Sequence, residues 1–215
     1  MLGTKKQDQK LVDIFMRGNR LSYSKGEYVV RPGEHNNAIF YIETGIVKAF
    51  DITKYGEENL LVIRQDKEIF PLIWAMTGQE RNVIYQVMDD VVLWRISRKD
   101  FLKELADEPG LMAPILDMTI EMYRVHSERI MGLEYRTVRE RLVAFILSLE
   151  PRFGKVKNNE IVLEVPLRHQ DIASSINATR ETTGRELNAL VKKGLLRVSK
   201  SIITIIDLRK LKEIL

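Results

Sequence analysis

The stretch LRHQDIASSINATRETTGRELNAL, residues 167–190, decides the fold of the C-terminal part of the chain. Apolar residues recur there at helical spacing on both sides of a short interruption: Ile172, Ala173 and Ile176 before it, Leu187 and Leu190 after it. Asn177 stands at the interruption, where it tolerates the left-handed backbone conformation better than other non-glycine residues. The pattern predicts two helices joined by a tight turn, a helix-turn-helix.

The second helix of this unit is predicted over residues 179–193, with Thr179 as its N-cap and Thr182 at its N3 position. Its exposed N-terminal half is predicted to carry four polar residues, namely Arg180, Glu181, Thr183 and Arg185. Arginine bonds guanine O6 and N7 with both arms of its guanidinium group, and glutamate accepts from cytosine N4. The helix is therefore predicted to contact DNA bases. The alternative is that this helix-turn-helix serves only in dimerisation.

Two apolar segments after this helix, Leu195–Ser199 and Ile202–Ile206, predict a pair of strands around Lys200-Ser201. Such a hairpin is the wing of a winged helix-turn-helix, and it places Lys200 near the DNA backbone. The predicted DNA-contacting residues are Arg180, Glu181, Arg185, Thr179, Thr182, Thr183, His169, Gln170 and Lys200.

The charge of the chain is unevenly distributed. Residues 137–215 contain 15 Lys and Arg against 9 Asp and Glu, a net +6, whereas residues 1–136 contain 19 against 21, a net −2. The positive charge therefore lies wholly in the part that holds the helix-turn-helix, as expected when one domain docks on a polyanion.

A long helix is predicted from Leu111 for more than twenty residues, and it carries two adjacent stripes. One stripe comprises Leu111, Ile115, Met118, Met122 and Val125; the other comprises Leu116, Thr119, Tyr123, His126, Ile130 and Leu133. Two stripes need cover on two sides. We expect one to pack on the chain's own domain and the other on a second copy, the alternative being a buried helix in a monomer. A further helix (138–149), a loop (151–159) and a strand (161–165) are predicted before the helix-turn-helix.

The N-terminal half is rich in short β-branched and aromatic segments separated by glycine-bearing turns. Strands are predicted at residues 28–30, 38–42, 46–50, 60–63 and 91–96, with helices at 7–15 and 99–105. This spacing is typical of a β-sandwich or a barrel-like β-roll. The fold class expected for the whole chain is α+β.

Four motifs give the chain a resemblance to the cyclic-AMP receptor protein (Crp/Fnr) superfamily: residues 31–33 (RPG), 40–47 (FYIETGIV), 78–81 (GQER) and 179–185 (TRETTGR). The resemblance implies a cyclic-nucleotide-binding-like β-roll or jelly roll over 1–110, a dimerisation helix and hinge over 111–136, and a winged helix-turn-helix over 137–215. It also implies a homodimeric transcription regulator on a palindromic operator, a hinge near residues 133–137, and base contacts by Arg180, Glu181 and Arg185.

The resemblance also identifies a candidate effector pocket, with departures from the relatives that bind cyclic nucleotides. Their Gly-Glu pair corresponds to Phe70-Pro71, their Arg-Ser pair to Arg81-Asn82, and their Thr-Ser pair to His126-Ser127. Phenylalanine cannot accept from a ribose hydroxyl, and proline has no backbone N–H. We therefore expect an effector other than cyclic AMP, with Arg81 pairing an acidic group on it. The candidate pocket residues are Phe70, Pro71, Leu72, Trp74, Arg81, Asn82, Tyr123, His126 and Ser127. The alternatives are no ligand, with Arg81 paired to a neighbour, or a cyclic-nucleotide-responsive regulator.

Composition excludes several classes of site. Without cysteine there is no disulfide, thiolate nucleophile, or cysteine-held zinc or iron–sulfur cluster, and the three histidines lie far apart. We expect no enzyme activity, no metal and no certain cofactor. The start MLGTKKQDQK lacks the apolar stretch of a signal peptide, and no apolar run is long enough for a membrane helix, which predicts a cytoplasmic protein. The expected partners are double-stranded DNA, a second copy and, for an activator, RNA polymerase; the alternative of another class is a nonspecific architectural DNA-binding protein.

Overall fold

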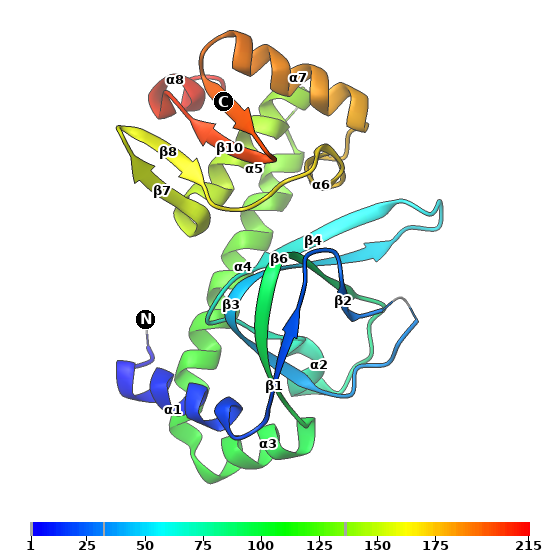
Figure 1. Cartoon of the computed structure of the whole chain (residues 1–215), viewed down its shortest axis with the longest axis vertical. Coiled ribbons are helices and arrows are strands. Elements are labelled where there is room, and N and C mark those ends of the chain that lie inside the picture. Colours follow the sequence, from blue (N-terminus) through cyan, green and yellow to red (C-terminus); the bar gives the residue numbers. More distant parts are fainter. Residues whose placement is uncertain (1, 32, 136) are drawn as a thin grey trace. The chain divides into compact units, whose positions relative to one another are not determined.

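The computed structural model describes residues 2–31, 33–135 and 137–215 (Figure 1). It divides into two compact units: unit 1 comprises residues 1–51 and 61–123, and unit 2 comprises residues 52–60 and 124–215. Pro32 in the predicted RPG turn and Arg136 in the predicted hinge lie outside the described residues.

Unit 1 is built on an antiparallel sheet in the order β1-β6-β3-β4, with β2 paired to β6 and β5 paired to β3. Its strands are β1 (Asn19–Tyr23), β2 (Tyr28–Val30), β3 (Ile39–Ile52), β4 (Glu58–Arg64), β5 (Ile69–Phe70) and β6 (Ile84–Ile96). Its helices are α1 (Lys5–Met16), α2 (Leu72–Thr77), α3 (Arg98–Asp107) and the short η1 (Pro109–Leu111). The tip of the β3–β4 hairpin falls in unit 2. The α+β class with an N-terminal β-rich domain is confirmed.

The predicted strands 38–42 and 46–50 form one continuous strand, β3. Gly45 between them is a bulge and not a turn: its φ is +100°, and a Cβ there would lie 2.3 Å from the carbonyl oxygen of Asp90. The β3–β6 register shifts at this place, between Ile42 and Val47. Gly45 therefore allows close approach of two backbones within the strand, although a glycine between two apolar segments had predicted a turn.

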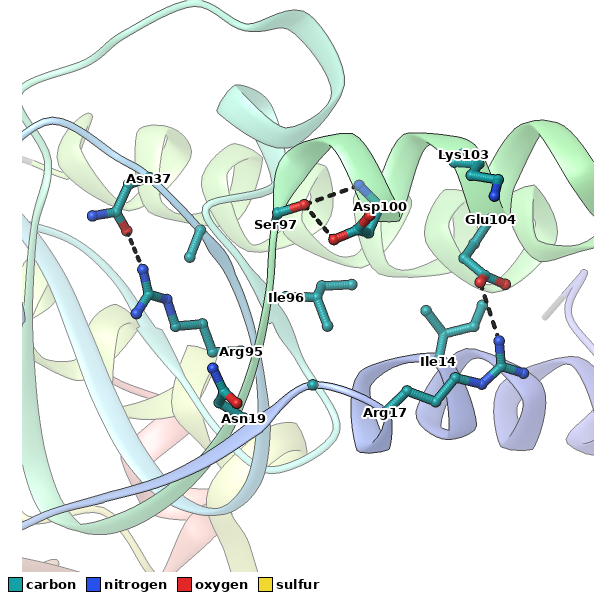
Figure 2. Close-up of a pocket in the computed structure, with 12 residues that line it drawn as sticks. Ile14, Arg17, Asn19, Asn37, Arg95, Ile96, Ser97, Asp100, Lys103 and Glu104 are labelled. Carbon is teal, nitrogen blue, oxygen red and sulfur yellow. Dashed lines mark hydrogen bonds and ion pairs between the residues drawn. The ribbon is translucent and has the colours of Figure 1, made fainter.

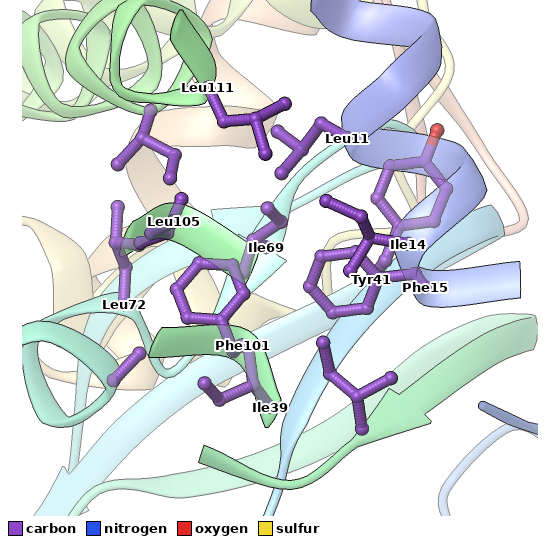
Figure 3. Close-up of a cluster of buried hydrophobic side chains, with 13 residues drawn as sticks. Leu11, Ile14, Phe15, Ile39, Tyr41, Ile69, Leu72, Phe101, Leu105 and Leu111 are labelled. Atoms are coloured by element: carbon purple, nitrogen blue, oxygen red, sulfur yellow. The ribbon is translucent and has the colours of Figure 1, made fainter. Parts of the chain in front are cut away.

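The core of unit 1 joins α1, α3 and η1 to the sheet (Figure 3). Phe15 is fully buried, and its ring centroid lies 5.6 Å from Tyr41 on β3 and 5.8 Å from Phe101 on α3. A capping box of Thr4 and Gln7 begins α1. These contacts fix the helices against the end of the roll.

The long helix α4 (Met112–Leu133) has the two faces that the sequence predicts. On the first stripe Leu111, Ile115 and Met122 are buried, and Met118 packs on the core of unit 1. On the second stripe Leu116 is 45%, Tyr123 75% and Ile130 63% exposed. One stripe therefore packs on the chain's own domain, and the other is apolar and open.

Unit 2 combines helices with a small antiparallel sheet in the order β7-β8-β10-β9. Its further elements are α5 (Val138–Phe153), β7 (Gly154–Lys157), β8 (Glu160–Leu163), α6 (His169–Ser175), α7 (Arg180–Lys192), β9 (Leu196–Ser199), β10 (Ile202–Ile205) and α8 (Leu208–Lys212). The segment 151–159, predicted as a loop, instead contains the last turn of α5 and strand β7. Pairing with β8 supplies the backbone hydrogen bonds that its polar sequence did not suggest.

Within the described part of the chain, no helix combines the length and apolar character needed to cross a lipid bilayer. The same residues contain no group of three or more His, Asp or Glu side chains placed to hold a metal ion.

Candidate nucleic-acid interface

The helix-turn-helix consists of α6, a tight turn and α7, as the sequence predicts. Ile172, Ala173 and Ile176 are at most 2% exposed, and Leu187 and Leu190 bury the facing side of α7. Asn177 has a φ of +51°, the left-handed conformation expected at the turn. The amide of Ala178 donates to the carbonyl of Ala173 at 3.1 Å and closes the turn.

Helix α7 begins at a capped and exposed N-terminus. The Thr179 hydroxyl accepts from the backbone amide of Thr182 at 3.1 Å, which confirms Thr179 as the N-cap. Arg180 and Glu181 in the first turn are exposed, and so is Arg185, whose side chain is 71% exposed. The next residue on this face, Asn188, is also exposed, although the sequence reasoning did not select it. This end of α7 therefore presents guanidinium, carboxylate and amide groups to solvent.

Thr183 is not part of that face, and its predicted exposure is wrong. The residue is 0% exposed, and its hydroxyl has no hydrogen-bond partner among the described residues. It lies on the same side of α7 as Leu187, one helical turn away, and that side packs into the domain. Proximity to Arg180 in sequence suggested exposure, but the helical period turns position 183 inward.

Helix α5 holds the turn through a residue that the sequence analysis missed. The Arg141 guanidinium group donates from Nε to the carbonyl oxygen of Ile176 at 2.8 Å and from an Nη atom to that of Tyr135 at 3.1 Å. A second ion pair links the helices, because Arg139 Nε lies 2.9 Å from a carboxylate oxygen of Glu186 on α7. Both arginines position α6 and α7 rather than contribute to their exposed face.

The remaining predicted contacts lie at the margins of α7. His169 is half-buried, and its ring lies against Gly184, where a Cβ would be 3.4 Å from His169 Nδ1. Gln170 is half-buried, whereas Lys200 is exposed at the tip of the β9–β10 wing. Lys200 and Ser201 have φ values of +49° and +67°, typical of a two-residue hairpin turn. Arg197 on β9 forms an ion pair with Glu160 on β8.

The candidate effector residues do not share one environment. Phe70 is fully buried in a stack, with ring centroids 5.3 Å from Phe40 and 4.6 Å from Tyr85. Pro71 is buried, and Leu72 belongs to the core of unit 1. Trp74 is half-buried, and its indole N–H donates to Glu80 at 3.0 Å.

The polar members of the set are on the surface. Arg81, Asn82 and Tyr123 are exposed in unit 1, whereas His126, exposed, and Ser127, half-buried, belong to unit 2. Arg81 forms no ion pair among the described residues. The alternative in which Arg81 pairs a neighbouring carboxylate therefore has no support in the structure.

Buried charges inside the β-roll were not anticipated from the sequence. Lys48 on β3 is 2% exposed, with its Nζ 4.4 Å from the centre of the Phe50 ring. Arg64 on β4 is 9% exposed, 3.2 Å from Glu68, and its buried Nε has no partner among the described residues. Burial raises the pKa of the Tyr85 hydroxyl, and the positive charges of Arg64 and Arg81 act on that pKa in the opposite direction.

Comparison with known proteins agrees with this architecture. Residues 20–108 match the family model described as the cyclic nucleotide-binding domain, and residues 140–214 match the Crp-like helix-turn-helix domain. The Global nitrogen regulator of Synechococcus elongatus is 26% identical over 187 residues, which are 86% of this chain and 84% of that protein. The Fumarate and nitrate reduction regulatory protein of Vibrio cholerae is 24% identical over 191 residues, 88% of this chain and 76% of that protein.

Solved structures show the same fold. A CooA mutant from Carboxydothermus hydrogenoformans superposes with a TM-score of 0.76 at 24% identity, covering 94% of this chain and 89% of that one. FixK2 from Bradyrhizobium japonicum gives a TM-score of 0.77 at 20% identity over 91% of this chain and 96% of that one. The motifs, the two matched domains and these relatives lead to one conclusion: the chain belongs to the Crp/Fnr family of DNA-binding transcription regulators.

Proposed function

We propose that the protein is a homodimeric regulator that inserts one α7 per subunit into successive major grooves of a palindromic operator. The observation that carries this proposal is the capped, exposed end of α7 with Arg180, Glu181 and Arg185. Guanidinium and carboxylate groups at such a position distinguish base pairs by their hydrogen-bond patterns in the major groove. Lys200 on the wing contacts phosphate, which fixes orientation without specifying sequence. We assign residues 1–110 to sensing, 111–136 to dimerisation and hinge, and 137–215 to DNA binding.

The open stripe of α4 supports the homodimer. Leu116, Tyr123 and Ile130 recur on one side of the helix and are 45%, 75% and 63% exposed. A contiguous apolar stripe on a long helix is stabilised by a second copy of the same helix.

The dimer is tested with Ile130→Asp, which places a charge in the proposed interface. We expect this variant to sediment as a monomer, because burying an unpaired carboxylate is costly. Met16→Asp, at an apolar residue 46% exposed on α1, is the matched control and keeps the dimer. A monomeric wild type would exclude the proposal.

Sequence specificity is tested by selecting bound duplexes from a random library and footprinting the recovered sites. We expect a short palindrome with half-site centres one helical turn apart, about 34–36 Å. Broad protection without a common sequence would identify a nonspecific architectural protein instead.

For the sensor, we propose an acidic effector other than cyclic AMP, bound by the β-roll. The support is Arg81, whose exposed guanidinium group has no ion pair among the described residues and is open to an acidic group. Phe70-Pro71 removes the hydroxyl acceptor and the backbone donor that ribose recognition needs. Isothermal titration with cyclic AMP is expected to give no heat. Micromolar binding would favour a cyclic-nucleotide-responsive regulator, the function suggested by the family model matched over residues 20–108.

A further inference from the structure

A cleft of about 520 Å³ lies in unit 1, where the end of α1, the start of β1, the end of β6 and the start of α3 meet (Figure 2). Pockets that hold small ligands commonly measure ~300–1,000 Å³. The residues that line it belong neither to the DNA-contacting set nor to the candidate effector set. The cleft is therefore large enough for a second small-molecule site.

The floor of the cleft is apolar and packed. Ile14, Ala38 and Ile96 line it and are at most 9% exposed. Gly18 completes the floor, and a Cβ at this position would lie 2.1 Å from the carbonyl oxygen of Arg95. Because a Cβ at position 18 would clash with the backbone of β6, only glycine allows this close packing at the base of the cleft.

Opposite charges stand at separated places along the cleft. Arg95 lies at one end with Asn19 and Asn37, whereas Ser97 and Asp100 lie beyond Ile96 on the far side (Figure 2). Arg95 donates to the Asn37 side-chain oxygen at 3.0 Å, and the Asp100 carboxylate accepts from the Ser97 hydroxyl at 2.6 Å. Within the described residues neither Arg95 nor Asp100 has an ion pair.

The other charged residues of the cleft do not neutralise these two. Arg17 and Glu104 are 3.1 Å apart and compensate each other. Lys103 is exposed and solvated. Asp100 is also exposed, whereas Arg95 is half-buried. The cleft therefore offers one cation and one anion that have no ion pair among the described residues, separated by an apolar floor.

We propose that this cleft binds a short aliphatic zwitterion of the amino-acid class. The ligand carboxylate pairs with the Arg95 guanidinium, its methylene groups lie over Ile96, and its ammonium group donates to Asp100. A guanidinium group has several N–H donors and a carboxylate has two acceptor oxygens, so both keep capacity beyond the contacts already made. The proposal concerns the sensor domain and does not depend on DNA binding.

Titration calorimetry of the full chain with a graded series of ω-amino acids tests the proposal. The probes are glycine, β-alanine, γ-aminobutyrate and ε-aminocaproate, whose charge separations increase in that order. Butyrate and butylamine serve as control analogues of γ-aminobutyrate: butyrate lacks the ammonium group and butylamine lacks the carboxylate. We expect at least one zwitterion to bind with a Kd below about 1 mM. The corresponding acid and amine are expected to bind about tenfold more weakly, since each loses one charge-assisted contact.

Three variants make the outcome specific to the cleft. Arg95→Gln is expected to weaken binding of the zwitterion about tenfold. Asp100→Asn is expected to remove the difference in affinity between the zwitterion and the corresponding acid. Lys99→Gln, at an exposed lysine on the same helix but outside the cleft lining, leaves binding unchanged. Circular dichroism confirms that each variant is folded. The absence of binding by all four zwitterions, equal binding by butyrate, or binding that neither variant alters would each overturn the proposal.

Discussion

At the scale of single residues, the exposed end of α7 separates side chains that face solvent from side chains that face the core. Arg180 and Arg185 are exposed, whereas Thr183 between them is fully buried. Thr183 shares the inward side of α7 with Leu187 and Leu190, which follow it at spacings of four and three residues, whereas Arg180 is exposed at the first position of the helix. The proposed base contacts are therefore assigned to the two arginines and Glu181.

Arg180→Ala and Arg185→Ala should each weaken binding to the selected operator by about 1–3 kcal/mol. The loss arises because each guanidinium group supplies two hydrogen bonds to one guanine. Fluorescence anisotropy at fixed salt measures it, with Arg209→Ala, on the exposed surface of α8, as the control. An equal loss on a scrambled duplex would show that these arginines contact only phosphate.

Thr183→Val should raise the free energy of unfolding by about 1 kcal/mol and leave the affinity for DNA unchanged. The Thr183 hydroxyl is buried without a partner among the described residues, and valine has the same shape without the polar group. Urea denaturation measures the change. Thr182→Val is the matched control, because it removes a hydroxyl 3.0 Å from that of Thr179 and should not stabilise. If Thr183→Val weakened operator binding as Arg180→Ala does, the inward placement of residue 183 would be wrong.

At the scale of elements, α5 holds the helix-turn-helix in place through hydrogen bonds from Arg141. Its contacts satisfy the carbonyl oxygen of Ile176, the C-cap of α6, and that of Tyr135 in the segment between α4 and α5. The neighbouring Arg139–Glu186 ion pair is partly exposed and is expected to contribute less to the free energy of unfolding.

Arg141→Met should lower the free energy of unfolding by about 1–3 kcal/mol, since it leaves polar groups without partners. Arg139→Met, two residues earlier on the same helix, should lower it by less than about 1 kcal/mol. Chemical denaturation of both variants makes the comparison. Equal effects would mean that Arg141 acts as an ordinary surface charge.

The N-terminal segment is tied to α4 by a carboxylate. The Asp117 side chain accepts from the backbone amides of Gly3 at 2.7 Å and Leu2 at 2.8 and 2.9 Å, and these bonds lower its pKa below the ordinary 3.8. Because the folded pKa is depressed, the contact is complete above pH 3.8 and is lost as the pH falls through the folded pKa. The NMR shift of the Gly3 amide should titrate with a midpoint below 3.8 in the wild type and not in Asp117→Asn. A midpoint at or above 3.8 would contradict the contact.

Elements with strong periodicity could be predicted from the sequence, and those governed by tertiary contacts could not. The helix-turn-helix, its Asn177 turn, its Thr179 cap and the two faces of α4 follow from local pattern. Strand β1 is mostly exposed and gains its place by pairing with β6, a partner far away in the sequence. The buried Lys48 and Arg64 were missed for a similar reason, since lysine and arginine in a strand usually indicate a solvent face.

At the scale of the whole molecule, the proposed sensing and DNA-binding roles are assigned to different parts of the chain. The net +6 over residues 137–215 lies with the helix-turn-helix, whereas the buried charges and the α1–α3 cleft lie in the β-rich part. In the proposed homodimer, the open stripe of α4 pairs two copies, so that two α7 helices are available to one duplex. A dimer on a palindrome gains specificity that one recognition helix does not supply.

The most direct test is the ratio of affinities for the selected palindrome and for a scrambled duplex of equal length and composition, measured by anisotropy at one physiological salt concentration. We predict that the palindrome binds at least about a thousandfold more tightly. Electrostatic attraction alone would act equally on both duplexes. A ratio near one would contradict the claim that α7 recognises a DNA sequence.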